Sequence, residues 1–339
     1  MKKIIISDVT LRDGNHAVNH QISEDVIKKY CIFAEQSKIP IIEVGHGNGI
    51  GASSLSVGIA KLSDKKLLNI ARKILKKTKL SVHSIPGFSK FDDLKLAIDS
   101  GVDIIRVGCN SSDIDIIVKQ IEFCKKNNVE CWGVLMMFHM ILKENKYIKS
   151  IKFLKDLGLK NIIIMDSAGY LLPDDVKKIV TKITNLFKIN IGFHAHNNLG
   201  YAIGNSIEAI KSGANIIDVS MNGFGAGAGN AQLEIFLTIL KRMNIFNKIN
   251  LEKIYEMSEE FEKMIKKTNP GYKNPFSTGP NILSATNGLF SGFASQVSFF
   301  CKEYGVSKLK AFKEIGKKQL VAGQEDLIMN VIFNLKNKI

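Results

Sequence analysis

The sequence lacks any long hydrophobic run. No apolar stretch approaches the roughly 18 residues that a helix needs to cross a bilayer, so a membrane-spanning protein is not expected. At the amino terminus only three consecutive apolar residues precede Ser7 and Asp8, which is too few for the apolar core of a signal peptide. We interpret this start as a first β-strand and expect a cytoplasmic protein.

Paired cysteines are missing as well. The chain has five cysteines, an odd number, and no Cys-X-X-Cys motif. This pattern argues against a disulfide framework and against a zinc site built from cysteines.

Arginine is scarce, because all but four of the 47 basic residues are lysine, although the formal net charge is +15. The lysines are spread over the polar sides of helix-like segments. Arginine is the residue that reads guanine and binds phosphate through two parallel donors, and no basic motif interleaved with aromatic residues is present. The charge therefore favours solvated helix faces over nucleic-acid binding, and it could also concentrate anionic substrates near a site.

Two kinds of segment alternate along most of the chain. Apolar runs of strand length alternate about eight times with amphipathic segments of helix length before residue 245. Eight βα units of this kind predict an α/β fold, the (β/α)8 or TIM barrel. A doubly wound open sheet is the alternative, but no Gly-X-Gly-X-X-Gly follows the first run. The runs begin near Ile4, Ile41, Leu80, Ile104, Glu130, Asn161, Ile189 and Asn215.

Longer helix-like segments follow the last run, interrupted by the turn-rich stretch TNPGYKNPFSTGPN. The 339-residue length suits one large α/β domain with a smaller appendage. We therefore expect a catalytic barrel over residues 1–250 and a small helical C-terminal domain over residues 251–339. This second domain would contact a partner, form a dimer or cap the barrel.

Polar side chains gather where the predicted strands end. In barrels of this kind the catalytic side chains come from the C-terminal ends of the strands and the loops behind them. Convergence of so many reactive groups at one rim is hard to explain as packing. The strand ends offer Arg12 and Asp13 with His16, Glu43 with His46, Ser84, Arg106, Met136 and Met137 with His139, Asp166 and Ser167, His194 with His196, and Asp218 with Ser220.

A candidate metal site lies among them. His194 and His196 are two residues apart on a strand end, so both side chains project from one face. Asp13 adds a carboxylate from the end of the first strand. In a closed barrel only the eighth strand lies between the first and the seventh, so the three side chains can meet at the rim. Two histidines and one carboxylate leave coordination positions open and suit Mn²⁺, Mg²⁺, Co²⁺ or Fe²⁺. The alternative is that one histidine is buried and hydrogen-bonded while the other faces a helix.

Two further groups next to Asp13 have suitable chemistry. Arg12 keeps its charge and can bind a carboxylate or an enolate oxygen, unless it merely pairs with Asp13. His16 ordinarily titrates near neutral pH and can act as a general base, unless it is an inert loop residue, which is our interpretation of His20. The segment GFGAGAGN, which ends at Asn230, is so rich in glycine that its backbone must approach a strand, a ligand oxygen or the next helix closely.

These motifs together resemble those of the 4-hydroxy-2-oxovalerate aldolases, a branch of a larger superfamily of metal-dependent lyases and synthases. The resemblance rests on TLRDG, HAHNNLGYAIGNSIEAI, GFGAGAGNAQLEIF and VAGQEDLIMNV, with support from LMMFHM and MDSAG. It extends from the first strand to the last helix. The motifs GAGAGN and GQED separate the chain from the isopropylmalate-synthase and HMG-CoA-lyase branches.

The resemblance implies a reaction and the residues that perform it. A 4-hydroxy-2-oxo acid would be cleaved reversibly to pyruvate and an aldehyde, with a divalent ion, usually Mn²⁺, as cofactor. An acylating acetaldehyde dehydrogenase would be the partner that receives the aldehyde, in the breakdown of aromatic hydrocarbons. The implied roles are Asp13, His194 and His196 as metal ligands, Arg12 as enolate stabiliser, His16 as acid and base, and Ser167 as a contact to the pyruvate portion.

This chain departs from the family pattern at the predicted aldehyde end. In the run GLFSGF, Phe290 occupies the place of a tyrosine that helps to position the substrate, and Asn48 replaces a common aspartate. We expect Phe290 to bind substrate and to alter the choice of aldehyde, which could be a larger, biosynthetic one. Three other classes stay open: a Claisen-type synthase that uses acetyl-CoA, an Fe²⁺ oxygenase, and a non-catalytic assembly or nucleic-acid-binding protein.

Overall fold

Eight parallel strands close into a barrel in the computed structural model, which describes residues 3–245 and 248–337. Each strand pairs with the next, and β1 pairs with β8 to complete the ring. The predicted (β/α)8 barrel with C-terminal helices is therefore confirmed. The strands are β1 (Ile5–Leu11), β2 (Ile41–Val44), β3 (Lys79–Ser84), β4 (Ile104–Asn110), β5 (Glu130–Met136), β6 (Asn161–Asp166), β7 (Asn190–Ala195) and β8 (Ile216–Val219).

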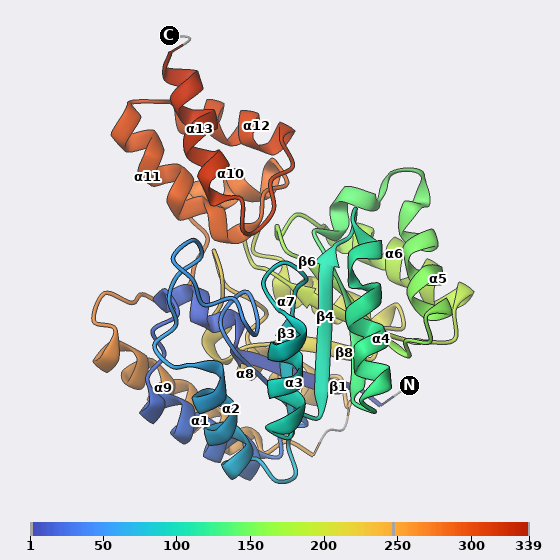
Figure 1. Ribbon diagram of the computed structural model, residues 1–339. Helices are drawn as coiled ribbons and strands as arrows, with labels where there is room; N and C mark the ends of the chain where they lie inside the picture. Colours follow the sequence, from blue (N-terminus) through green and yellow to red (C-terminus); the bar gives the residue numbers. More distant parts are fainter. Residues whose placement is uncertain (1–2, 246–247, 338–339) are drawn as a thin grey trace.

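One helix follows each strand and covers the outside of the barrel (Figure 1). Local signals set several of their ends. The Ser23 hydroxyl accepts a hydrogen bond from the Val26 backbone N–H at the start of α1, and Pro173 occupies the first position of α6. The barrel helices are α1 (Glu24–Ser37), α2 (Asp64–Ile74), α3 (Phe91–Asp99), α4 (Val118–Lys126), α5 (Lys146–Asp156), α6 (Pro173–Leu186), α7 (Ala202–Lys211) and α8 (Leu233–Arg242).

Among the described residues, five more α-helices follow the eighth βα unit, and they pack in two different places. The first, α9 (Leu251–Thr268), lies against α1 and α8, and its buried side chains, among them Phe261 and Ile265, belong to the core of the barrel. The other four form a group of their own around a second core that includes Phe293, Phe312 and Ile332 (Figure 1). They are α10 (Gly279–Thr286), α11 (Ala294–Tyr304), α12 (Lys308–Lys317) and α13 (Glu325–Lys336).

This packing bears on the domain boundary that the sequence suggested at residue 250. The amphipathic helix α9 follows residue 250 in the chain, yet its buried side chains belong to the same hydrophobic core as those of the barrel. The division into 1–250 and 251–339 stays a prediction, and its outermost residues, 1–2 and 338–339, lie outside the described residues, as do 246–247. Within the described ranges, no helix combines the length and apolar character that crossing a membrane requires.

The interior of the barrel is layered, and the layers change character along the strands. Side chains two residues apart on a strand point to the same face. A lower layer contains the apolar side chains of Ile5, Ile41, Ile104 and Ile216. Two residues further along, each of these four strands carries a buried polar residue instead. The polar layer therefore forms the floor of the C-terminal end of the barrel, directly beneath the site.

Candidate functional site

Three buried side chains converge at the C-terminal end of the barrel. His194 lies near the end of β7, His196 follows that strand, and Asp13 begins the short 3-10 helix after β1. One possible ligand atom from each residue lies within 4.8 Å of those of the other two. The predicted set of Asp13, His194 and His196 is thus brought together, with all three side chains shielded from solvent.

The two imidazoles face each other through their Nε2 atoms. Nδ1 of His194 lies 3.0 Å from the Asp218 carboxylate, which fixes the proton on Nδ1 and leaves Nε2 as a lone-pair donor. That Nε2 atom lies 3.4 Å from Nε2 of His196. Burial lowers the pKa of His196 to about 3, so the His196 ring is neutral near neutral pH. Two imidazoles beside a carboxylate form a donor set that fits a divalent ion.

The glycine-rich segment holds the carboxylate of this set. Oδ2 of Asp13 accepts hydrogen bonds from Nδ2 of Asn230 at 2.7 Å and from the backbone N–H of Ala226 at 3.2 Å. A Cβ atom at Gly225 would lie 2.6 Å from the same Oδ2 atom. The close approach expected of GFGAGAGN is therefore an approach to Asp13, and Gly225 is the residue that permits it.

Arg12 sits between the candidate metal ligands and the loop after β2. Its Nε donates to Oε1 of Glu43 at 2.6 Å, and its Nη1 donates to Oδ1 of Asp13 at 2.7 Å. Burial alone would raise the pKa of Asp13, but Arg12 and His196 outweigh that effect and hold the pKa well below its usual range. Nη2 of Arg12 is buried and has no hydrogen-bond partner among the described residues. The pairing with Asp13 therefore leaves one guanidinium donor for an anionic ligand.

His16 lies one helical turn from Asp13 in a cluster of rings. Its ring centroid is 5.2 Å from that of His20 and 6.0 Å from that of Phe290. Burial lowers the pKa of His16, so the imidazole is neutral near neutral pH and able to accept a proton. His20, to which the sequence assigns no role, stacks on His46 with centroids 3.5 Å apart.

Two cavities meet at these rings. An inner cavity of about 30 Å³ is lined by Arg12, Ser167 and the metal-ligand candidates Asp13 and His196. An outer cavity of about 710 Å³ opens above it. His16, Asn48 and Phe290 line both cavities and so form the boundary between them. The predicted substrate contacts thus occupy two zones, with Ser167 in the inner one and Phe290 at the passage to the outer one.

Ser167 also joins the barrel to the C-terminal segment. Its hydroxyl oxygen accepts a hydrogen bond from the backbone N–H of Met137, and its carbonyl oxygen accepts one from the Ser291 hydroxyl at 2.6 Å. Ala322, from the VAGQED motif, also lines the inner cavity. The helical group α10 to α13 therefore supplies part of the wall of the site.

The sequence patterns do not assign a role to four polar residues of the site. Glu43, Arg106 and Asp218 are recognisable as residues at the ends of predicted strands, but no chemical role follows from that position. Asn230 is recognisable only as the last residue of the glycine-rich segment GFGAGAGN. A repeated pattern could have indicated that the first three lie in one layer of the barrel, because each follows two isoleucines, in Ile-Ile-Glu, Ile-Ile-Arg and Ile-Ile-Asp, on three different strands. Asn230 gives no such signal, since its contact with Asp13 spans 217 positions.

Comparison with known proteins places the chain in a family. Residues 3–260 match the HMGL-like family, and residues 278–337 match the DmpG-like communication domain. A 4-hydroxy-2-oxovalerate aldolase of Spirochaeta aurantia is 44% identical over 336 residues, covering 99% of this chain and 97% of that protein. Another, from Pectobacterium atrosepticum, is 41% identical over 343 residues, with the same two coverages.

A more distant likeness concerns the fold alone. The carboxyl transferase domain of Rhizobium etli pyruvate carboxylase superposes with a TM-score of 0.84 at 13% identity, covering 100% of this chain and 61% of that one. The resemblance that TLRDG, GAGAGN and GQED indicated is confirmed by the two aldolase relatives, which extend over nearly the full length. The chain belongs to the HMGL-like family and, within it, to the 4-hydroxy-2-oxovalerate aldolase group.

Proposed function

We propose that this protein is a divalent-metal-dependent aldolase. It would cleave a 4-hydroxy-2-oxo acid, such as 4-hydroxy-2-oxovalerate or a close analogue, reversibly into pyruvate and an aldehyde. The observation that carries the proposal is the unpartnered Nη2 of Arg12, which is buried in the wall of the same inner cavity as Asp13 and His196. A cavity with a metal-ligand set and a free guanidinium donor suits a small 2-oxo acid. The names of the relatives support this substrate class.

Asp13, His194 and His196 would hold the metal, and we propose Mn²⁺, with Mg²⁺ or Co²⁺ as substitutes. When bound, the ion supplies Lewis-acid polarisation of a carbonyl oxygen. The charges around the site favour a cation. Arg12 and Arg106 face three buried carboxylates, those of Asp13, Glu43 and Asp218, so the two arginines leave one of these negative charges unbalanced.

Other side chains of the site would transfer the proton and stabilise the developing charge. His16, neutral because burial lowers its pKa, would take the proton from the C4 hydroxyl of the substrate, directly or through water. The C3–C4 bond then breaks and the aldehyde leaves toward the outer cavity. Arg12 would direct its free Nη2 at the negative charge that develops on the pyruvate portion, and Ser167 would contact that portion from the end of β6.

Phe290 would set the aldehyde end of the site. Its ring separates the two cavities beside His16 and carries no hydroxyl group, so the proton for C3 of pyruvate would come from water or from another residue. An apolar ring at this passage would select the aldehyde by shape rather than by a hydrogen bond. The outer cavity leaves room for a chain longer than that of acetaldehyde.

The C-terminal helices would act both as a cap and as a docking domain. We propose that the barrel extends through α9 and that the second domain begins after it, because the core of α9 is the core of the barrel. The match of residues 278–337 to a communication domain supports an acylating acetaldehyde dehydrogenase as partner in a hetero-oligomer. We also propose a cytoplasmic location and, from the resemblance to the family, a part in the breakdown of aromatic hydrocarbons.

Product analysis tests the proposed reaction. The protein is incubated with pyruvate, Mn²⁺ and a panel of aldehydes, and the adducts are identified by mass; cleavage of 4-hydroxy-2-oxo acids is followed in parallel. A 4-hydroxy-2-oxo acid adduct with at least one aldehyde is expected. The absence of both adduct formation and cleavage would refute the aldolase assignment. Thiol release from acetyl-CoA with a 2-oxo acid would indicate the Claisen-type alternative instead.

A further inference from the structure

A layer of buried charge lies beneath the site, on strands whose sequences share one pattern. Ser7, Glu43, Arg106 and Asp218 each follow two isoleucines, and each lies on a different strand. All four side chains are almost completely shielded from solvent. Because they stand two residues beyond Ile5, Ile41, Ile104 and Ile216, they form the next layer of the barrel interior.

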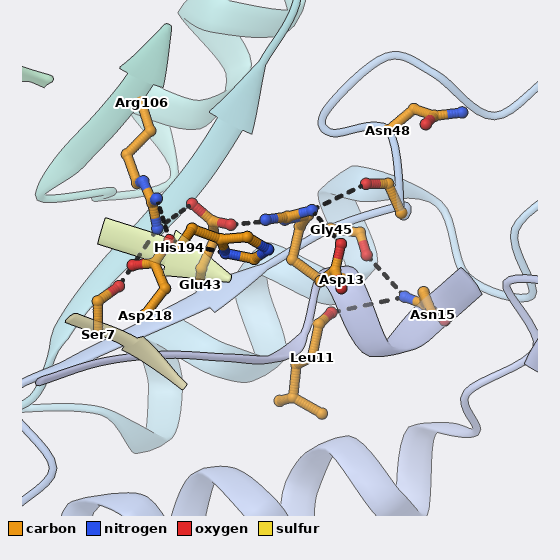
Figure 2. Close-up of polar contacts among 12 residues, drawn as sticks. Ser7, Leu11, Asp13, Asn15, Glu43, Gly45, Asn48, Arg106, His194 and Asp218 are labelled. Atoms are coloured by element: carbon orange, nitrogen blue, oxygen red, sulfur yellow. Dashed lines mark hydrogen bonds and ion pairs between the residues drawn. The ribbon is translucent and has the colours of Figure 1, made fainter. Parts of the chain in front are cut away.

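Arg106 crosses this layer and joins its members. From β4 its Nη1 makes an ion pair with Oε2 of Glu43 on β2 at 3.0 Å and donates to the Ser7 hydroxyl on β1 at 3.2 Å. Its Nη2 donates to Oδ2 of Asp218 on β8 at 2.5 Å. Figure 2 shows the guanidinium of Arg106 aimed at these three side chains. One side chain therefore ties four strands of the barrel together.

Each carboxylate that Arg106 contacts also holds a residue of the proposed site. Glu43 uses its other oxygen, Oε1, to accept the Nε donor of Arg12. Asp218 uses the same oxygen, Oδ2, to accept from Nδ1 of His194. The Arg106 guanidinium thus lies at the centre of a chain of contacts that leads to the free donor of Arg12 on one side and to Nε2 of His194 on the other.

Stability alone does not account for this arrangement. Buried ion pairs seldom stabilise a fold more than well-packed apolar groups of similar volume do, because removing charges from water is costly. The layer immediately below fills the same cross-section of the barrel with isoleucine and other apolar side chains. The four polar residues therefore have a reason to be there other than closing the barrel.

We propose that Arg106 is a positioning residue for both halves of the site. It fixes the carboxylate of Asp218, which orients His194 toward the metal, and it fixes the carboxylate of Glu43, which orients Arg12 toward the substrate. Its effect on the pyruvate portion rests on the proposed function, whereas its effect on the metal site does not. Substitution of Arg106 therefore weakens metal binding and substrate binding together.

The variant Arg106→Lys tests the proposal with least risk to the fold. A lysine keeps the positive charge, but a single ammonium cannot make the forked contacts of a guanidinium to two carboxylates. Loss of a group that orients a metal ligand typically costs about 10- to 100-fold in metal affinity. Titration calorimetry with Mn²⁺ is expected to show a loss of this size, together with a raised KM for pyruvate in the aldol direction.

A matched control and a double variant separate positioning from general damage. Arg72→Lys alters an arginine of α2 that pairs with Asp103 on the outside of the barrel and is expected to keep the wild-type Kd for Mn²⁺. Asp218→Asn removes one carboxylate of the chain of contacts. If Arg106 acts on the metal through Asp218, the losses of Mn²⁺ affinity in Arg106→Lys and Asp218→Asn are less than additive in the double variant.

Each outcome decides the question. A lower melting temperature with an unchanged Kd for Mn²⁺ and an unchanged KM for pyruvate would make Arg106 a purely structural residue, and strictly additive losses would also overturn the proposal. Because the calorimetric titration needs no turnover, a wild-type protein that binds Mn²⁺ but forms no aldol product would refute the proposed function and still leave Arg106 tested by metal affinity.

Discussion

A substitution at Gly225 tests how Asp13, a proposed metal ligand, is held in place. The change Gly225→Ala adds one methyl group at a position where a Cβ atom would lie 2.4 Å from Nδ2 of Asn230 and 2.6 Å from Oδ2 of Asp13. Real Cβ atoms do not approach other heavy atoms so closely, so Asn230 or Asp13 must shift, and we expect their mutual hydrogen bond to be lost. The methyl group acts on the metal ligand without changing any charge.

The magnitude follows from the contact that is lost. Nδ2 of Asn230 donates to Asp13 at 2.7 Å, and a hydrogen bond to a charged group is worth about 1.5–3 kcal/mol. Since about 1.4 kcal/mol corresponds to a factor of ten, the Kd for Mn²⁺ is expected to rise about 10- to 150-fold. The measurement is calorimetric titration of the purified protein with Mn²⁺.

Gly271 provides the matched control. It lines the outer cavity, and a Cβ atom there would meet no heavy atom within 4 Å. Gly271→Ala is therefore expected to bind Mn²⁺ as the wild type does. Equal Kd values for Gly225→Ala and the wild type would refute the reasoning, because they would mean that the orientation of Asp13 does not depend on Asn230.

The remaining predictions concern the reacting groups. His16→Ala and Arg12→Ala are each expected to lower kcat by about two orders of magnitude or more while Mn²⁺ stays bound; full activity in either variant removes that residue from the mechanism. Because burial lowers the pKa of His16, the base stays neutral as the pH falls past about 6.5, and the acid limb of the kcat/KM profile is expected below that pH; a limb above it contradicts His16 as base. Phe290→Tyr is expected to change the preferred aldehyde or the stereochemistry of the product, and an identical product profile would exclude Phe290 from the aldehyde site. Removal of metal with a chelator should abolish aldol formation, with Mn²⁺ restoring it; activity that survives complete removal would exclude a metal-dependent reaction.

Patterns along the chain were enough to predict the barrel. Its strands are apolar runs and its helices are amphipathic, and both periods are visible without a structure. The grouping of Asp13 with His194 and His196 was predictable for the same reason, because the order of strands in a closed barrel places the first and seventh near each other. These features depend on local sequence and on one topological rule.

Contacts across the fold were not predictable in the same way. The amphipathic face of α9 gives no indication that α1 and α8 are what it covers. Asn230 reaches Asp13 through a loop whose course depends on Gly225, and Ala322 reaches the inner cavity from a loop between α12 and α13. Each of these contacts depends on the three-dimensional packing of segments that lie far apart in the sequence.

The shared wall of the two cavities has a consequence for how such a protein can diversify. The charged layer, His16 and the histidine pair all belong to the barrel, whereas Phe290 and Ala322 approach from the C-terminal segment. Under the proposed function, bond cleavage and aldehyde selection would therefore be encoded in separate stretches of the polypeptide. Substitutions in the second stretch can redirect the choice of aldehyde while the reacting groups keep their geometry, so one chemistry can serve new substrates through changes confined to its last 60 or so residues.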